Sequence, residues 1–455
     1  IQTLSLKKTS LSRLNIFDRI DRQTMPGTRD TLRQSLGLPQ SDTLATNDVP
    51  TDSLVNDTSI VNPQDTLFAK PAKDSAAIDS ETLFYLYHHL ALSTHSKRYT
   101  DGNPQSDFYS PFPIYMDSAR TLDKAERQSI RNEFKLVYSN RFADVTAGID
   151  YDLLRFAYVQ PQPAVDTPDY DLMTRRSYNN LSLTSSLSIR SDTSFLFDAR
   201  ARYFLSGFNG GDLHLSGTIK KSIFNSMLTI EGGYHRYEPD YFYQHYNSNH
   251  FRWDQGLSKT RTIEVKGTFD LTPWKTRFSF KPSLIRYFTY LDSSSRPVQY
   301  SGELQVLQAS VEKDFQLWKF HSSNKVVFQY ANPSDVLNLP FVYVHHKFAF
   351  RHRFNFSITG GKLDTQVGWS LYYYPSYEPD EYMPALGMYH RQDDESLGNR
   401  PLFNVFANIQ IQRTRLYIKL YHLNSFIQPR DYYTAPGYPM SPMMIKYGVS
   451  WSFYD

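Results

Sequence analysis

One segment of the sequence concentrates side chains that could bind a metal or narrow a pore: "YFYQHYNSNHFRWD", residues 241–254. Its two histidines are five positions apart, and imidazole metal sites demand a fuller ligand set with defined geometry. We therefore favour a loop that folds over a channel mouth or into its lumen, with a metal site as the weaker alternative. The residues predicted for this plug or constriction are Tyr243, His245, Tyr246, Asn249, His250 and Trp253.

A second set of candidates is basic and alternates with apolar residues. In "KFAFRHRFNFSI", residues 347–358, phenylalanines fall on one face and cations on the other. If the charged face lines a lumen, an excess of cations would favour anionic solutes. Alternatively, acids such as Asp198, Glu264 and Asp270 pair with the cations across strands and stiffen the wall. The pore-lining candidates are Arg200, Arg202, Lys220, Lys266, Arg277, Lys281, Lys347, Arg351 and Arg353.

Other chemistry is poorly supported. "YEPD" occurs at 237–240 and 377–380, where carboxylates could bind Ca²⁺, but Pro-Asp is also a common turn starter and we favour the turn. The sequence lacks a nucleophile elbow, a phosphate-binding loop and a zinc-binding helix motif. We therefore predict no enzymatic activity, no cofactor and no metal.

The elements that position these residues are strands, because apolar residues recur at every second position. Arg286 interrupts the apolar face of one run, and we expect it to lie above the apolar band or beside a bulge at Pro282. Turn signals separate the runs. The sixteen runs are approximately 82–92, 129–140, 143–158, 176–190, 193–207, 211–221, 226–237, 257–271, 275–290, 298–312, 316–330, 346–358, 362–374, 401–412, 414–426 and 443–454.

Composition places these strands in a membrane. Aromatic residues make up 15% of the 455 residues, yet the mean hydropathy is −0.52. No apolar run is long enough for a transmembrane helix, which leaves a closed barrel as the spanning structure. Short and mostly long connections alternate, as in an up-and-down meander. We predict an all-β transmembrane antiparallel up-and-down β-barrel of about 16 strands, with 14–18 as the range, and both termini in the periplasm.

Residues 1–80 differ from the rest of the chain. They are rich in Ser, Thr, Asp and Pro without apolar periodicity, which predicts an extended or disordered periplasmic lead or plug segment ahead of a barrel at 81–455. No secretory signal is visible in "IQTLSLKKTS", so we expect that it has been removed or lies upstream. The chain has no cysteine, and its net charge of +3 is too small to indicate a nucleic-acid partner.

Two stretches resemble the putative porin family of Bacteroidota outer membranes: "YFYQHYNSNHFRWD" at 241–254 and "YFLSGFNGGDLHLSGTI" at 203–219. The resemblance covers residues 81–455 and implies an outer-membrane channel without catalytic residues. Short Asp-Ser/Thr-apolar motifs in the lead segment also resemble Bacteroidota O-glycosylation acceptors. The residues that they indicate are Thr31, Thr43, Ser53, Thr66 and Ser75.

Two functional hypotheses follow. The first is an outer-membrane porin that passes small hydrophilic solutes, anionic ones among them, by passive diffusion. The second is a structural barrel, plugged by loops or by residues 1–80, that serves as a subunit of a larger outer-membrane assembly, secretion or uptake complex. Both expect the lipid bilayer and lipopolysaccharide as partners, and residues 1–80 could contact other outer-membrane or periplasmic proteins. The sequence leaves solute and oligomeric state open.

Overall fold

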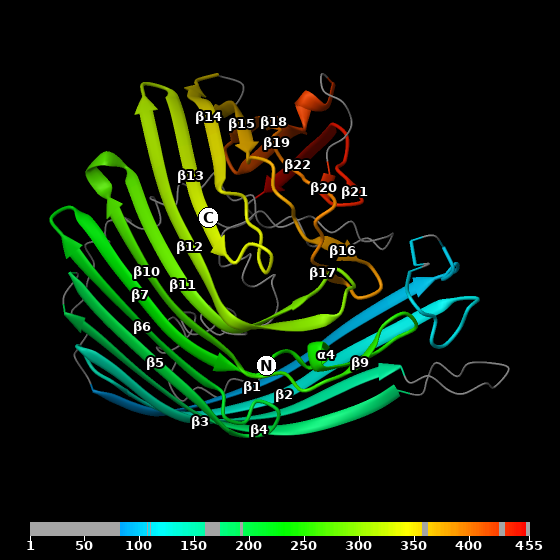
Figure 1. Ribbon diagram of the computed structural model, residues 1–455. Coiled ribbons are helices and arrows are strands. Elements are labelled where there is room, and N and C mark those ends of the chain that lie inside the picture. The colour runs from blue at the N-terminus through cyan, green and yellow to red at the C-terminus, as the bar shows by residue number, and fades with distance from the viewer. Residues whose placement is uncertain are drawn as a thin grey trace.

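The computed structural model describes residues 82–451 except for 107, 110, 160–172, 192–193, 357–362 and 427–432. This part of the chain is almost entirely β. Sixteen strands form one antiparallel sheet. Their order in the sheet is the same as their order along the chain, so each strand pairs with the sheet strands that precede and follow it in sequence. The sheet curves strongly, and several long connections lie on its concave side (Figure 1). The predicted sixteen-stranded meander is thus confirmed as a sheet.

Each of the sixteen predicted runs corresponds to one strand of this sheet. The strands are β1 (Leu83–Asp101), β2 (Thr121–Ser139), β3 (Ala143–Val159), β4 (Met173–Ser191), β5 (Phe195–Ser206), β6 (Leu213–Ile223), β7 (Ser226–Tyr237), β10 (Thr260–Leu271), β11 (Thr276–Leu291), β12 (Pro297–Leu317), β13 (Phe320–Asn332), β14 (Val342–Phe354), β15 (Leu363–Tyr373), β18 (Leu402–Ile411), β19 (Thr414–Tyr421) and β22 (Met444–Trp451).

Smaller elements lie in the connections between these strands. Three two-stranded sheets pair β8 (His245–Asn247) with β9 (Arg252–Asp254), β16 (Glu381–Met383) with β17 (Met388–His390), and β20 (Tyr433–Ala435) with β21 (Tyr438–Pro439). The helical elements of the described residues are α4 (Tyr241–Gln244), η1 (Thr272–Trp274) and η3 (Leu423–Phe426). None of them has the length and apolar character that a membrane-spanning helix requires.

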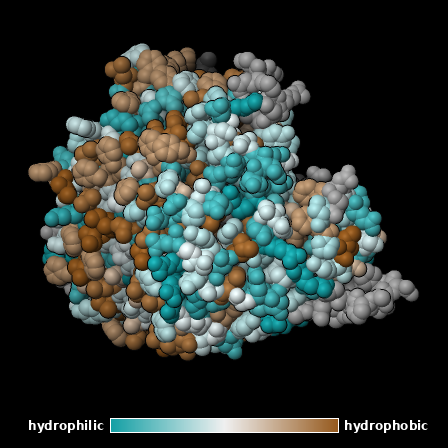
Figure 2. Space-filling model, in the orientation of Figure 1, coloured by the Kyte–Doolittle hydropathy of each residue, from teal (hydrophilic) through white to brown (hydrophobic). Residues whose placement is uncertain are grey.

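The outer face of the first strands carries a sharply bounded apolar band. It covers alternate residues of 84–92 on β1, 130–138 on β2 and 145–153 on β3, and the register places these segments side by side. Phe84 and Leu92 are 70% and 71% exposed. Each segment has the roughly 9–11 residues that a tilted strand needs to cross a bilayer. In Figure 2 hydrophobic residues gather on the left, over the strand wall, and hydrophilic ones over the centre and right.

β1 and β2 extend well beyond the apolar band. Their pairing continues through Lys97 opposite Ala125 to Asp101 opposite Thr121, which shortens the predicted 93–128 loop to residues 102–120. The outward residues of this extension, such as Thr94 and Ser96, are polar. Sequence periodicity missed this part because an extramembrane hairpin needs no apolar face, only main-chain pairing.

The irregularity near Arg286 is a bulge, although not at Pro282. The register between β11 and β12 shifts between Arg286 and Phe288, and Tyr287 takes φ 56°. An extra residue reverses which face the following side chains point to. Phe288 consequently packs in a buried cluster with Ile285 and Leu304. Arg286 stays outside, paired with Glu303 at 3.1 Å.

The two ends of the sheet order are β1 and β22. Among the described residues β1 pairs with β2 and β22 with β19, so each strand has one free main-chain edge. The outward side chains of β22 are strongly exposed, with Tyr447 at 79% and Val449 at 66%. This apolar outer face continues the band of the other strands.

Candidate functional site

The inner wall of the sheet is lined with charge, as the alternation predicts. Every predicted pore-lining residue lies opposite the apolar band on its strand. The densest network is on β2 to β5, where Arg202 binds Asp150 at 2.5 Å and Arg131 binds Asp152 at 3.3 Å. Asp150 is only 2% exposed. These cations therefore neutralise buried carboxylates of neighbouring strands.

The same pairing continues around the wall. Lys281 reaches Glu264 at 2.9 Å, and Lys266 reaches Glu231 at 3.1 Å. Further pairs join Arg200 to Asp198 at 2.9 Å, Arg277 to Asp270, and Arg353 to Asp364 through two hydrogen bonds of 2.5 and 2.9 Å. The ion-paired interpretation of the wall is thus favoured over a uniformly basic lumen for six of the nine candidates.

The other three candidates have different surroundings. Lys347 lies over the ring of Phe406 at 5.0 Å. Arg351 lies opposite Gln366 in the register of β14 and β15. Lys220 of β6 has no ion pair within the described part of the chain. Within the described part of the chain, Lys220 and Arg351 thus form no ion pair with a carboxylate.

The segment 238–259 folds inward and packs against the upper ends of distant strands. Asp240 caps α4 by accepting a hydrogen bond from the Phe242 N–H. Tyr241 of α4 then stacks on Phe156 of β3, with ring centroids 4.2 Å apart. Farther along, the indole N–H of Trp253 donates to the Phe242 carbonyl at 3.0 Å, which ties β9 back to α4. The loop is therefore a folded unit.

Asn249 anchors this unit to β2 and to the loop before it. Its backbone N–H donates to Asp123 at 2.8 Å, and its side-chain N–H donates to the Thr121 hydroxyl at 2.8 Å. Its side-chain oxygen accepts from the N–H groups of Met116 and Asp117, each at 3.0 Å. All the hydrogen-bonding capacity of one buried amide is used. The β7–β10 loop is fixed across the upper ends of β2 and β3.

A third connection, residues 374–401 between β15 and β18, completes the arrangement. Lys97 of β1 donates to the Tyr246 hydroxyl at 2.9 Å and to the Ala385 carbonyl. The backbone N–H of Arg391 donates to the backbone carbonyl of Leu291 at 2.9 Å. We call the three connections 102–120, 238–259 and 374–401 the outer cap. Their shared apolar core consists of Tyr109, Ala125, Tyr243, Tyr246, Phe251, Leu291, Met383, Ala385 and Leu386.

Comparison with known sequences identifies the family. A sequence model of the family described as "Putative porin" matches residues 67–455. The chain belongs to the putative porin family. The resemblance to the putative porin family is thereby confirmed, and the family together with the sheet supports an outer-membrane channel or transporter. No curated protein matches the chain.

Solved structures resemble this porin-family chain in fold alone. The copper transporter OprC aligns with a TM-score of 0.59 at 10% identity, over 82% of this chain and 63% of its own. The siderophore receptor PirA from Acinetobacter baumannii aligns with a TM-score of 0.52 at 8% identity, over 81% of this chain and 60% of its own. The FrpB iron transporter from Neisseria meningitidis aligns with a TM-score of 0.52 at 10% identity, over 80% of this chain and 61% of its own. The chain thus spans less than two thirds of these relatives.

The predicted constriction residues all lie in the outer cap of this porin-family chain. Tyr243, Tyr246, Asn249 and His250 are buried in it, and His250 stacks on Tyr109 with centroids 4.4 Å apart. His245 instead contacts Asp254 at 2.5 Å, while His250 faces the Thr121 hydroxyl. No group of three or more metal-ligating side chains occurs among the described residues. Both histidines contact other residues of the cap.

Burial shifts the proton equilibria of two cap groups that lie beyond the apolar band. It lowers the pKa of Lys97 to about 7, although the charge of Asp123 opposes the shift. It raises the pKa of Asp123 to about 6, against the effects of the Asn249 hydrogen bond and of Lys97. Desolvation of the charged form is the dominant cause in both cases. The cap therefore contains two groups that titrate near neutral pH.

Several residues of the cap carry no local sequence signal. Lys97, Asp123, Leu291 and Ala385 belong to four different connections or strands, and only the curvature of the sheet brings them together. The O-glycosylation candidates Thr31, Thr43, Ser53, Thr66 and Ser75 lie outside the described residues, as does the whole segment 1–80. The predicted glycosylation sites and the predicted role of residues 1–80 therefore remain untested predictions.

Proposed function

We propose that the chain closes into a sixteen-stranded outer-membrane barrel through which small hydrophilic solutes diffuse passively. The observation that carries this proposal is the charged inner wall opposite an exposed apolar outer band. Ion pairs such as Arg353–Asp364, with both side chains strongly exposed, require water in the enclosed space. A barrel of this strand number encloses an aqueous channel.

Closure would join β1 to β22. Their free edges would otherwise leave main-chain N–H and C=O groups unpaired in lipid, where each costs several kcal/mol. The outward residues of both strands are apolar and exposed, as in Leu86 at 65% and Tyr447 at 79%. Lys97 of β1 already contacts Ala385 in the β15–β18 connection, which supports an approach of the two halves on the side of the cap.

The outer cap would set the size limit of the channel. Its three connections meet in one apolar core and extend from β1 and β2 to β11 and β15. A fixed obstruction of this kind leaves the path for solutes between the cap and the charged wall. We therefore expect a conductance well below that of an uncapped barrel with the same number of strands.

Ion selectivity should be weak with a modest preference for anions. Carboxylates neutralise most of the predicted cations, including Lys266 and Lys281. Lys220 and Arg351 remain as the source of any positive potential in the lumen. The reversal potential across a planar bilayer with a salt gradient measures this preference.

Single-channel recording tests the function directly. Purified protein in a planar bilayer should give discrete current steps, and replacement of residues 241–254 by a short Gly-Ser linker should enlarge them severalfold. A matched control shortens the 292–296 turn on the same side, which contributes no residue to the core cluster of the cap. Absence of current steps from folded wild-type protein would contradict the proposal.

The buried core of the cap favours a second candidate, a plugged barrel that acts as a subunit of a larger outer-membrane assembly. A buried apolar cluster of three loops is more than a size filter requires. In that case the wild type gives no current steps and co-purifies with defined partners in mild detergent. Loss of those partners on removal of residues 1–80 would assign the contact to that segment.

A further inference from the structure

The outward face of β2 to β4 changes character abruptly above the apolar band. Ile130 of β2 and Leu153 of β3 lie opposite each other in the last apolar row. In the next two outward rows the register places Gln128 opposite Arg155, and Glu126 opposite Ala157. Two residues along a strand advance about 7 Å. These rows are therefore at the depth of lipid headgroups, which extend the bilayer from about 30 to about 40–45 Å.

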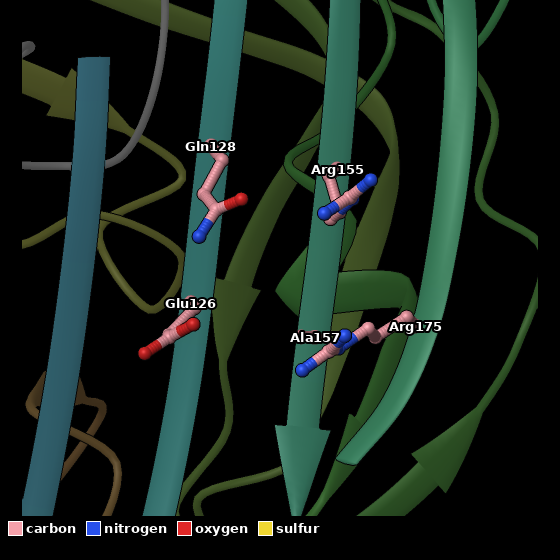
Figure 3. Close-up of a pocket in the computed structure, with 5 residues that line it drawn as sticks. All are labelled: Glu126, Gln128, Arg155, Ala157 and Arg175. Atoms are coloured by element: carbon pink, nitrogen blue, oxygen red, sulfur yellow. The ribbon is translucent and has the colours of Figure 1, made fainter.

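A cavity of about 70 Å³ opens on this face, lined by Glu126, Gln128, Arg155, Ala157 and Arg175. Figure 3 shows these side chains on three adjacent strands, with Arg175 reaching across the middle strand at Ala157 and Arg155 farther along that strand. Phe156 packs inward on Tyr241, so its neighbours in sequence point away from the lumen. Arg175 lies opposite Ala157 in the pairing of β3 with β4. The small alanine leaves room for the Arg175 side chain to lie across β3.

The charges around this cavity differ from those of the lumen. Within the described part of the chain neither Arg155 nor Arg175 has an ion pair or a side-chain hydrogen bond, and both are exposed. The one carboxylate of the cavity, Glu126, is held by Lys124 at 2.7 Å. Two cations thus face one cavity without a carboxylate contact of their own. An anion with several acceptor oxygens matches this arrangement, because guanidinium groups bind phosphate through paired hydrogen bonds.

We propose that this cavity binds the phosphate group of a glycolipid in the outer leaflet of the outer membrane. The apolar row directly below, with Ile130 42% exposed, would contact the acyl chains of the same molecule. The row above adds Arg98 opposite Lys124, which suits further anionic groups of a large headgroup. The cavity opens toward the membrane and not toward the lumen, so a lipid reaches it more readily than a solute in transit does. This inference requires insertion in the outer membrane, as the proposed function does, but not conduction.

Binding of phosphorylated lipid A to the full chain in detergent tests the site, with affinities from native mass spectrometry. We expect the double variant Arg155→Ala/Arg175→Ala to bind at least tenfold more weakly than the wild type. Ala157→Leu keeps both arginines and fills the cavity, and we expect it to weaken binding as well. Arg286→Ala removes an exposed outward arginine that is paired with Glu303, and it serves as the matched control with unchanged affinity. Heat-modifiable migration on gels verifies folding of each variant.

Two further probes identify the ligand group. Dephosphorylated lipid A should bind about as weakly to the wild type as phosphorylated lipid A binds to the double variant. Inorganic phosphate at millimolar concentration should not displace the lipid. Equal binding of phosphorylated and dephosphorylated lipid A, efficient displacement by inorganic phosphate, or unchanged affinity of the double variant would each overturn the proposal. Single-channel conductance of the double variant should equal that of the wild type, which separates this test from that of the channel.

Discussion

Lys97 of β1 and Ala385 of the β15–β18 connection are joined by a hydrogen bond from the ammonium group to the backbone carbonyl, across most of the sheet. The same ammonium donates to the hydroxyl of Tyr246. One half-buried amine thereby connects the first strand to two of the three connections of the outer cap. Local sequence offers no reason for this contact, yet it holds the cap in place.

Replacing Lys97 should loosen the cap without unfolding the sixteen-stranded sheet. Lys97→Met keeps the apolar stem but removes both hydrogen bonds and leaves the Ala385 carbonyl without this donor, and a buried polar group that loses its partner costs about 1–3 kcal/mol. We expect amide exchange in residues 381–390 to accelerate at least tenfold and current noise to increase. Lys124→Met, on the outer face of the neighbouring strand, is the control and should leave exchange in the cap unchanged.

The stability of the cap should depend on pH in two opposite ways. The pKa of Lys97 falls to about 7 in the folded cap, below its ordinary value, so an opened cap binds more protons between pH 7 and 10. Stability should therefore rise with pH above 7. The pKa of Asp123 rises to about 6, so the folded cap binds more protons between pH 4 and 6, and stability should fall with pH over that range.

Together these shifts predict a minimum of cap stability between about pH 6 and 7. Amide exchange of the cap, corrected for the intrinsic exchange rate at each pH, measures it. Lys97→Met should abolish the increase in cap stability above pH 7, and Asp123→Asn should abolish the increase in cap stability as the pH falls from 6 to 4. Flat protection across pH 4–10 in the wild type would argue against both shifts.

The buried pair Arg202–Asp150 should be far more sensitive to mutation than an exposed pair of the same wall. Arg202→Met leaves the Asp150 carboxylate, 2% exposed, without its cation, and we expect a loss of about 3–5 kcal/mol in the free energy of unfolding. Asp150→Asn in addition should recover most of that loss. Urea unfolding in lipid vesicles provides the measurement.

Arg353→Met is the matched control for that experiment. Its side chain is 59% exposed and that of its partner Asp364 is 43% exposed, so water screens the pair. We expect a change of at most about 1 kcal/mol. Similar losses for Arg202→Met and Arg353→Met would mean that the buried network does not stabilise the wall in the way described.

If β1 and β22 pair to close the barrel, cysteines introduced on these two strands should form a disulfide only when both side chains point to the same face of the sheet. The chain has no cysteine, so introduced pairs report without background. Leu90→Cys should cross-link within one chain to Cys at an outward position of β22, Tyr447 or Val449. The inward position Lys446→Cys is the control and should not react with it. Cross-links that form only between two chains would show that the sheet edges pair in an oligomer instead.

Much of this protein follows from local sequence. The sixteen strands and the inward or outward direction of residues such as Arg351 and Phe348 follow from a period of two, because a strand between water and lipid must alternate polar and apolar side chains. The ion pairing of Glu264 and Asp270 was open from sequence, since it depends on register between strands. The pairs with Lys281 and Arg277 became evident only in the sheet.

The sequence alone thus determined the number of strands and which face each one turns to lipid, because both depend on residues that are neighbours in the chain. Only the tertiary structure decided where the bulge after Arg286 falls, how Asn249 meets Asp123, and that Arg155 and Arg175 share an outward cavity. These relationships join residues that are far apart along the chain. Their physical origin is the curvature and register of the sheet, which no local pattern encodes.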